Sequence, residues 1–160
     1  MPRRKSVGFK RDIGVDSLYG SELIQKFINV VMSRGKKNVA RNIVYEALEA
    51  LTKKAGGEKE RGLELFNKAF FEVVPTVEVR PRRVGGSVYQ VPREVPKDRA
   101  KALAMRWLIS AAAGRSAKTM GQRLAAELLE ASEGRGNAIK KKQDMHRMAE
   151  SNRAFSHYAW

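Results

Sequence analysis

The sequence contains no cysteine, which excludes disulfide bonds and thiolate metal sites. Histidine occurs only at His146 and His157, and there is neither an HExxH pair nor a cluster of carboxylates with metal-ligand spacing. A Walker-type phosphate loop is absent, and no G-x-G-x-x-G follows a strand. The sequence therefore contains none of these catalytic or phosphate-binding motifs. The sequence predicts a protein that is not an enzyme and that needs no cofactor or metal.

Long apolar runs are absent as well. No run reaches the roughly 18 residues that a membrane span requires. The first residues, MPRRKSVGFKRD, have a basic head without the apolar stretch of a secretory signal. These patterns predict a soluble protein of the cytoplasm without a membrane partner.

Acidic residues are scarce and unevenly placed. The chain has 32 Lys and Arg against 17 Asp and Glu, a formal net charge of +15. No acidic residue lies between Glu22 and Glu46, or between Asp98 and Glu127. Such an excess costs stability through self-repulsion unless a polyanion takes it up. Nucleic acid is the favoured partner. An anionic membrane, the main competitor, would need a basic helix with an apolar face free to insert.

The apolar residues that are present make up 42% of 160 residues, enough for one domain with a sizeable core. Their spacing repeats in the manner of helices with one buried stripe. The last of these stripes is thin, which indicates a helix lying on the surface. Ser116 is a candidate N-cap for the fifth helix. The predicted helices cover residues 20–33, 37–54, 58–74, 97–113, 116–132 and 137–149.

One stretch is typical of strands instead. In VEVRPRRVGGSVYQVPREV, residues 77–95, alternating runs flank Gly85 and Gly86, which can supply the positive φ angles of a tight turn. Pro81 and Pro92 lack the N–H that pairing needs, so we expect no third strand. A lone two-stranded ribbon is only marginally stable. Its base is therefore expected to pack on the helices while its tip projects.

Together these patterns predict a mainly α protein. A six-helix body carries one protruding two-stranded antiparallel β-ribbon, at about residues 76–92, and an extended basic N-terminal arm at residues 1–15. All of it forms a single domain, residues 1–160. For His157, in the tail, a flexible position is favoured over stacking on a base. At this point two functions stay open, an RNA scaffold protein and a DNA-bending architectural protein with a basic ribbon arm.

Three segments carry a resemblance to a known family. LIQKFINVVMSRGKKNVARNIVYEAL, PTVEVRPRRVGGSVYQVP and RWLISAAAGR resemble, in this order, the family of small-subunit ribosomal protein seven of bacterial type. The resemblance extends over essentially the whole chain. It is weakest in the variable tail, residues 150–160, so least is transferred there.

The resemblance implies a structural component of the small ribosomal subunit. Members bind directly to the 3′ major domain of small-subunit ribosomal RNA and nucleate assembly of the head. Their ribbon lies near the exit-site tRNA and the messenger path, and their neighbours include the small-subunit proteins numbered nine and eleven. Bacterial members can also repress translation of their own operon by binding its messenger, which stays an alternative function here. No homo-oligomer is implied.

Carried onto this chain, the resemblance gives a set of basic side chains expected to contact RNA. They lie in the arm, at the turn into the second helix, on the ribbon and its base, at the turn between the fourth and fifth helices, and on the last helix. The candidate RNA-binding residues are Arg3, Arg4, Lys5, Lys10, Arg11, Lys36, Lys37, Arg41, Arg80, Arg82, Arg83, Arg93, Arg99, Arg115, Lys118, Lys140, Lys141, Lys142 and Arg147.

Overall fold

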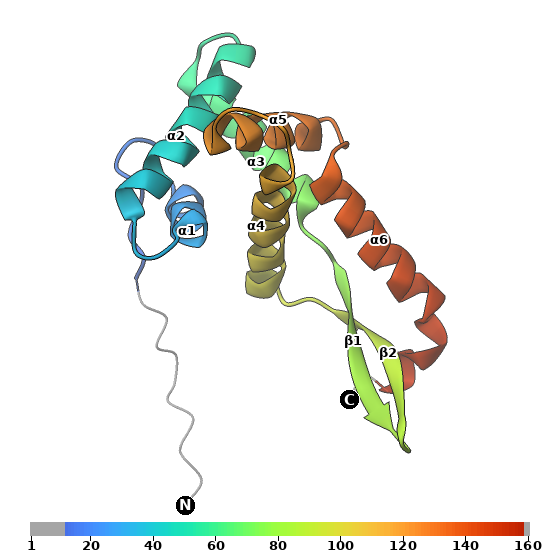
Figure 1. The fold of residues 1–160 in the computed structure, drawn as a ribbon. Coiled ribbons are helices and arrows are strands. Elements are labelled where there is room, and N and C mark those ends of the chain that lie inside the picture. Colours follow the sequence, from blue (N-terminus) through green and yellow to red (C-terminus); the bar gives the residue numbers. More distant parts are fainter. Residues whose placement is uncertain (1–11, 159–160) are drawn as a thin grey trace, which may run out of the picture.

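The computed structural model describes residues 12–158 of the chain (Figure 1). Within this range, helices dominate, and one two-stranded antiparallel sheet projects from the helical body. This confirms the predicted fold class. The candidate residues of the basic arm, from Arg3 to Arg11, lie outside the described residues. The elements are α1 (Glu22–Val31), α2 (Lys37–Lys54), α3 (Lys59–Val73), β1 (Val77–Val84), β2 (Ser87–Glu94), α4 (Lys97–Ala113), α5 (Met120–Ser132), α6 (Asn137–Ser151) and the 3₁₀ helix η1 (Arg153–Tyr158).

The core lies between helices α1 to α5. Phe27 of α1 meets Phe66 of α3 edge to face, with ring centroids 5.8 Å apart, and Phe70 stacks on Phe66 at 6.3 Å. All three rings are fully buried, and Leu48 and Leu108 close the core from α2 and α4. Each such side chain contributes about 1.5–3 kcal/mol through its removal from water. The apolar stripes read from the sequence therefore supply a body rigid enough to carry the ribbon.

Helix α5 begins later than its apolar spacing predicts. Ser116 is the cap expected from the sequence, but the helix starts at Met120 and its N-cap is Thr119. The Thr119 hydroxyl accepts a hydrogen bond from the Gln122 N–H (3.2 Å) and donates one to Glu46 Oε1 (2.7 Å). This side chain therefore both caps α5 and ties the start of the helix to α2.

The contact between α5 and Glu46 of α2 also depends on Gly121. Gly121 lies directly against Glu46, and a Cβ on Gly121 would stand only 2.2 Å from Glu46 Oε2 and 2.8 Å from Glu46 Cβ. Any larger residue would therefore push α5 away from α2.

The ribbon pairs Val77 with Glu94 at its base and Val84 with Ser87 at its tip. Gly85 (φ +55°) and Gly86 (φ +90°) make the turn, as expected. The Val95 N–H donates to the Thr76 carbonyl at 3.0 Å, which fixes the alternation of the ladder. Pro81 and Pro92 then fall at positions whose N–H would point outward. They cost no hydrogen bond within the ribbon, and each removes one donor that an additional strand would need.

Helix α6 runs alongside the ribbon (Figure 1). The Val79 N–H lies 3.4 Å from Met145 Sδ, and the Thr76 N–H donates to His146 Nε2 at 3.3 Å. Burial lowers the pKa of His146, and Lys142 lowers it further, so the ring keeps the lone pair that this bond requires. The helix buries only Ala138, Ile139 and Ala149, as the thin stripe indicated. Helix α6 is thus a surface strut for the inner half of the ribbon.

Candidate nucleic-acid interface

The turn between α1 and α2 places several cations at an uncapped helix start. Lys36 is the N-cap residue of α2 and makes no side-chain capping bond, and Lys37 is the first helical residue. Both side chains are exposed, so two ammonium groups stand beside the helix start and attract an anion, while the Lys37 N–H donates to the Gly35 carbonyl at 2.9 Å. The positive end of the helix dipole adds to this attraction for an anion. This arrangement suits a phosphate.

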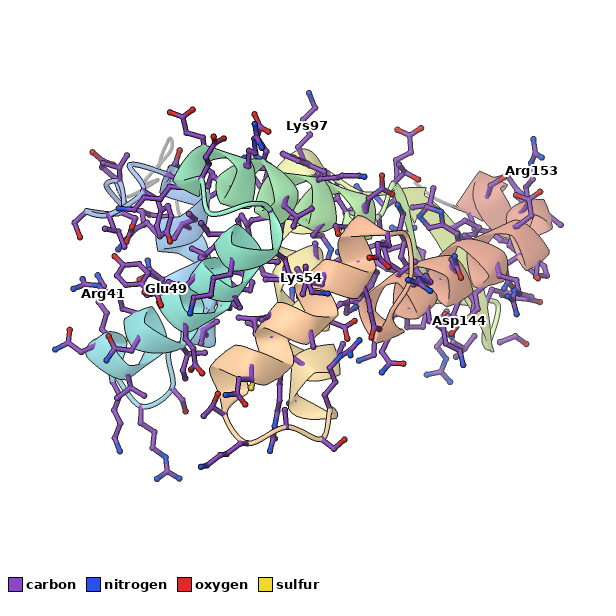
Figure 2. All side chains as sticks on the ribbon, turned by 90° about the horizontal axis from the view of Figure 1, so that it is seen from above. Arg41, Glu49, Lys54, Lys97, Asp144 and Arg153 are labelled. Atoms are coloured by element: carbon purple, nitrogen blue, oxygen red, sulfur yellow. The ribbon has the colours of Figure 1, made fainter. Side chains whose placement is uncertain are left out.

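Arg41 and Arg34 extend the same surface. Arg41 lies one turn further along α2, and Figure 2 shows its side chain projecting from the helix. Its Nε is buried without a hydrogen-bond partner among the described residues. Arg34, in the turn itself, takes a left-handed backbone conformation (φ +53°) and is exposed. Arg34 was not among the candidates, although the run SRGKK carries its charge. We name the α2 surface as Arg34, Lys36, Lys37 and Arg41.

The three ribbon arginines do not share one face. Alternation along β1 puts Arg80 and Arg82 on one side of the ribbon and Arg83 on the other. Arg80 Nε donates to Glu78 Oε1 at 2.7 Å, and Arg82 Nη1 donates to the Tyr158 carbonyl at 3.3 Å. Arg83 is exposed near the tip. The ribbon can therefore present cations in two directions.

Glu78 organises the ribbon base. Its side chain is only 6% exposed and accepts hydrogen bonds from Arg80 Nε and from Arg99 Nε, the latter at 2.8–2.9 Å. Burial raises the pKa of Glu78, but the hydrogen bonds from Arg99 and Arg80 outweigh it and leave the pKa below its ordinary value. Arg99 and Arg80 stay partly exposed. They can still reach phosphate while they hold the ribbon against α4.

Arg115 is committed more deeply. Its Nε donates to Glu127 Oε2 at 2.6 Å, its Nη1 donates to Glu130 Oε1 at 2.8 Å, and its Nη2 pairs with Glu130 Oε2. The bonds to Glu130 hold the pKa of Arg115 above its ordinary value despite burial, and they lower the pKa of Glu130. Every guanidinium nitrogen is thus engaged inside the protein. This geometry favours a structural role over the expected contact with RNA.

Glu127 extends this cluster to α6. It is fully buried, and its Oε1 accepts a hydrogen bond from the Ala138 N–H (2.8 Å) in the first turn of α6. The cluster of Arg115, Glu127 and Glu130 therefore connects the turn after α4, the second half of α5 and the start of α6. The second acid-free stretch of the sequence ends at this point.

The other candidates are mostly on the surface. Lys118 is exposed in the turn before α5, and Arg93 near the ribbon base. Along α6, Lys141 Nζ bonds to Ser110 Oγ (2.8 Å), and Lys142 Nζ donates to the Glu72 carbonyl (2.6 Å). The remaining exposed candidates on this helix are Lys140 and Arg147.

The sequence analysis did not predict that aromatic side chains of the tail pack against the ribbon. Phe155 and Tyr158 of η1 pack on Tyr89 of β2. His157, for which a flexible position was favoured, lies with its ring 4.0 Å from that of Tyr158, and its Nδ1 is 2.9 Å from the Ala154 carbonyl. The only sequence signal was the density of aromatics in SNRAFSHYAW.

The described residues hold no group of three or more histidine and acidic side chains that could bind a metal ion. None of the helices within residues 12–158 combines the length and the hydropathy needed to cross a membrane. A hollow of about 570 Å³ at the ribbon base is lined mainly by apolar side chains, including Phe71, with Lys97 and Lys101 beside them. The surface is thus rich in cations, and its chemistry suits binding rather than catalysis.

Comparison with known proteins agrees with this chemistry. The model of the family described as ribosomal protein S7p/S5e matches residues 2–153. Proteins named small ribosomal subunit protein uS7 are similar over the whole of both chains, with 56% identity in Idiomarina loihiensis, 56% in Rhodopseudomonas palustris and 52% in Photobacterium profundum. Members of this family are structural proteins and not enzymes. The match over nearly the full length, on a helical body with one ribbon, shows that the chain belongs to the S7p/S5e family of ribosomal proteins.

Proposed function

We propose that this protein is a structural component of the head of the small ribosomal subunit, in the cytoplasm, and that it binds the 3′ major domain of small-subunit ribosomal RNA directly. The observation that carries the proposal is the α2 surface, where exposed cations surround an uncapped helix start. Phosphates fix the position of such a protein on RNA. Because an A-form helix hides its major-groove edges, recognition rests on the shape of the RNA and on its loops and junctions.

The second part of the proposal concerns the ribbon and α6. Arg82, Arg83, Lys140 and Arg147 would lie near the exit-site tRNA and the messenger. Figure 2 supports two separate contact regions, because Arg41 of α2 and Arg153 of η1 lie at opposite ends of the molecule. The body would then bind ribosomal RNA and nucleate assembly, while the ribbon works beside the passing ligands. The small-subunit proteins numbered nine and eleven would be its neighbours.

A gel-shift titration at two salt concentrations tests the first part. The probes are the 3′ major domain RNA, a scrambled RNA of equal length and a DNA duplex. All three will show binding that weakens with salt, because counterion release is not selective. At the higher salt we expect a preference of about a thousandfold for the ribosomal fragment, a typical margin of a specific site over a non-specific one. Equal affinity for all three would refute the proposal, and preference for the duplex would indicate a DNA-architectural protein instead.

Reversal of charge at the ribbon tests the second part. The double variant Arg82→Glu/Arg83→Glu should lower tRNA retention or decoding fidelity more than subunit assembly, because the cations of the α2 surface stay intact. The measurements are tRNA retention on purified ribosomes and the yield of assembled small subunits in gradients. If assembly fails before tRNA retention does, the division between body and ribbon is wrong.

A further inference from the structure

The C-terminal helix η1 is folded back against the outer half of the ribbon. The ring of Phe155 lies 5.0 Å from that of Tyr89, and the ring of Tyr158 lies 5.7 Å from it. Phe155 and Tyr158 also stack on each other, at 6.5 Å. We call these three rings the tail clasp. One aromatic of the ribbon is thus gripped by two aromatics of the tail.

The tail clasp also holds an arginine of the neighbouring strand. Arg82 is the cross-strand partner of Tyr89, so both side chains lie on the same face of the ribbon. Arg82 Nη1 donates to the carbonyl of Tyr158, at 3.3 Å. Within η1, the His157 ring packs on Tyr158 and its Nδ1 bonds to the Ala154 carbonyl. These two contacts stabilise the 3₁₀ helix itself. The clasp therefore engages both strands at the same level.

This level lies beyond the other supports of the ribbon. Glu78, with its arginines, and the contact of α6 with Val79 lie in the half of β1 nearest the body, and the contact of α6 with Thr76 lies just before the strand. A two-stranded ribbon without further packing is marginally stable and bends easily. The packing of η1 on β2 supports it further out, at Tyr89.

We propose that Phe155 and Tyr158 are positioning residues, which fix the direction of the outer ribbon and thereby the direction in which Arg82 and Arg83 point. The tail then acts as a second strut, for the outer half of the ribbon, and its aromatic residues determine the positions that the ribbon cations can occupy. The consequence for RNA binding rests on the function proposed above. The mechanical role does not, and it can be tested without RNA.

The test uses spin labels on the free protein. Because the chain has no cysteine, Ser87→Cys at the ribbon tip and Ala113→Cys at the end of α4 give one defined pair, and both positions are exposed. The parent pair should show one narrow distance distribution between labels. Adding Phe155→Ala should broaden it, with a roughly threefold to tenfold loss of hydrogen-exchange protection in the outer ribbon, the range of one aromatic pair.

Two controls separate the strut from a general loss of order. Phe155→Tyr keeps the ring and should keep the narrow distribution. Met148→Ala removes an exposed apolar side chain of α6 outside the tail clasp and should also change nothing. Phe155 is outside the buried core, so the variant should unfold at nearly the parent temperature. An unchanged distance distribution and unchanged ribbon protection in Phe155→Ala would overturn the proposal.

A gel shift with the 3′ major domain fragment then measures the consequence. Phe155→Ala should bind a few-fold more weakly with an unchanged salt slope, because no charge is removed. If the parent protein shows no preference for this fragment, the proposed function fails while the spin-label result still decides the strut. If the preference stands but the label distribution does not change, the strut fails alone.

Discussion

Replacing Arg115 by alanine is expected to lower the free energy of unfolding by about 3–5 kcal/mol, the usual cost of removing one partner of a buried ion pair. The reason is Glu127, which has no exposed surface and would be left in the core without the guanidinium that pairs with it. Glu130, at the other end of the same guanidinium, would lose its bidentate partner. Urea denaturation followed by circular dichroism, with the slope checked for change, measures the effect.

A matched control is the pair of Arg135 and Glu133. This pair is also formed by an arginine and a glutamate, but both side chains are more than half exposed. Arg135→Ala should therefore change stability far less than Arg115→Ala, because solvent screens an exposed pair. An equal destabilisation of the two variants would show that the Arg115 cluster is not a buried anchor.

The double variant Arg115→Met/Glu127→Gln identifies the cause of the destabilisation. It removes both buried charges, and the glutamine can still accept the hydrogen bond from the Ala138 N–H. The double variant should be more stable than Arg115→Ala, since glutamine in place of Glu127 leaves no uncompensated charge at the buried position, while Glu130 is partly exposed to solvent. A double variant less stable than Arg115→Ala would assign the effect to poorer packing instead.

The helices and the ribbon could be predicted because their signals are local. The stripe of Ile24, Phe27 and Ile28 fixes which face of α1 is buried, and the pair Gly85–Gly86 fixes the ribbon turn. The start of α5 was predicted wrongly. Thr119 caps that helix while it bonds to Glu46, a residue far away in the sequence. The sequence Thr119-x-x-Gln122 also fits a capping box, a local signal that Ser116 lacks and that the prediction did not use.

The candidate interface was predicted as a charge distribution and not as a set of contacts. A sequence gives every arginine the same charge, whether it faces solvent or a buried glutamate. Arg115 was grouped with Lys118 for this reason, although only Lys118 is exposed. The contact of Arg82 with Tyr158 could not be predicted either, because the two residues are 76 positions apart in the sequence.

The cations that hold the fold together differ from those of the α2 surface in whether a carboxylate lies next to them. Glu78, Glu127 and Glu130 neutralise cations at the ribbon base and between α4 and α5, where they hold the fold together. Within the part of the chain that the structure describes, none of the ion pairs involves a residue of the α2 surface. Its charge is therefore left for an external partner, and this surface should supply the largest share of the affinity for RNA.

Neutralising three of the four cations of the α2 surface is accordingly expected to weaken binding to the 3′ major domain RNA on the order of a hundredfold near 0.1 M salt. The variant is Lys36→Gln/Lys37→Gln/Arg41→Gln. Every cation that no longer neutralises a phosphate should lower the slope of log affinity against log salt by about 0.7–0.9, so the slope should fall by about two to three. The measurement is a filter-binding or gel-shift titration over a series of salt concentrations.

The control removes the same number of positive charges near the opposite end of α2. Lys53 and Lys54 close α2, and Lys59 opens α3 after the intervening turn. All three are exposed, so Lys53→Gln/Lys54→Gln/Lys59→Gln lowers the net charge equally. If binding depends on net charge alone, both triple variants bind more weakly by the same factor and with the same slope. A weakening confined to the first variant would locate the phosphate contacts at the start of α2, where the helix dipole and the cations act on the same anion.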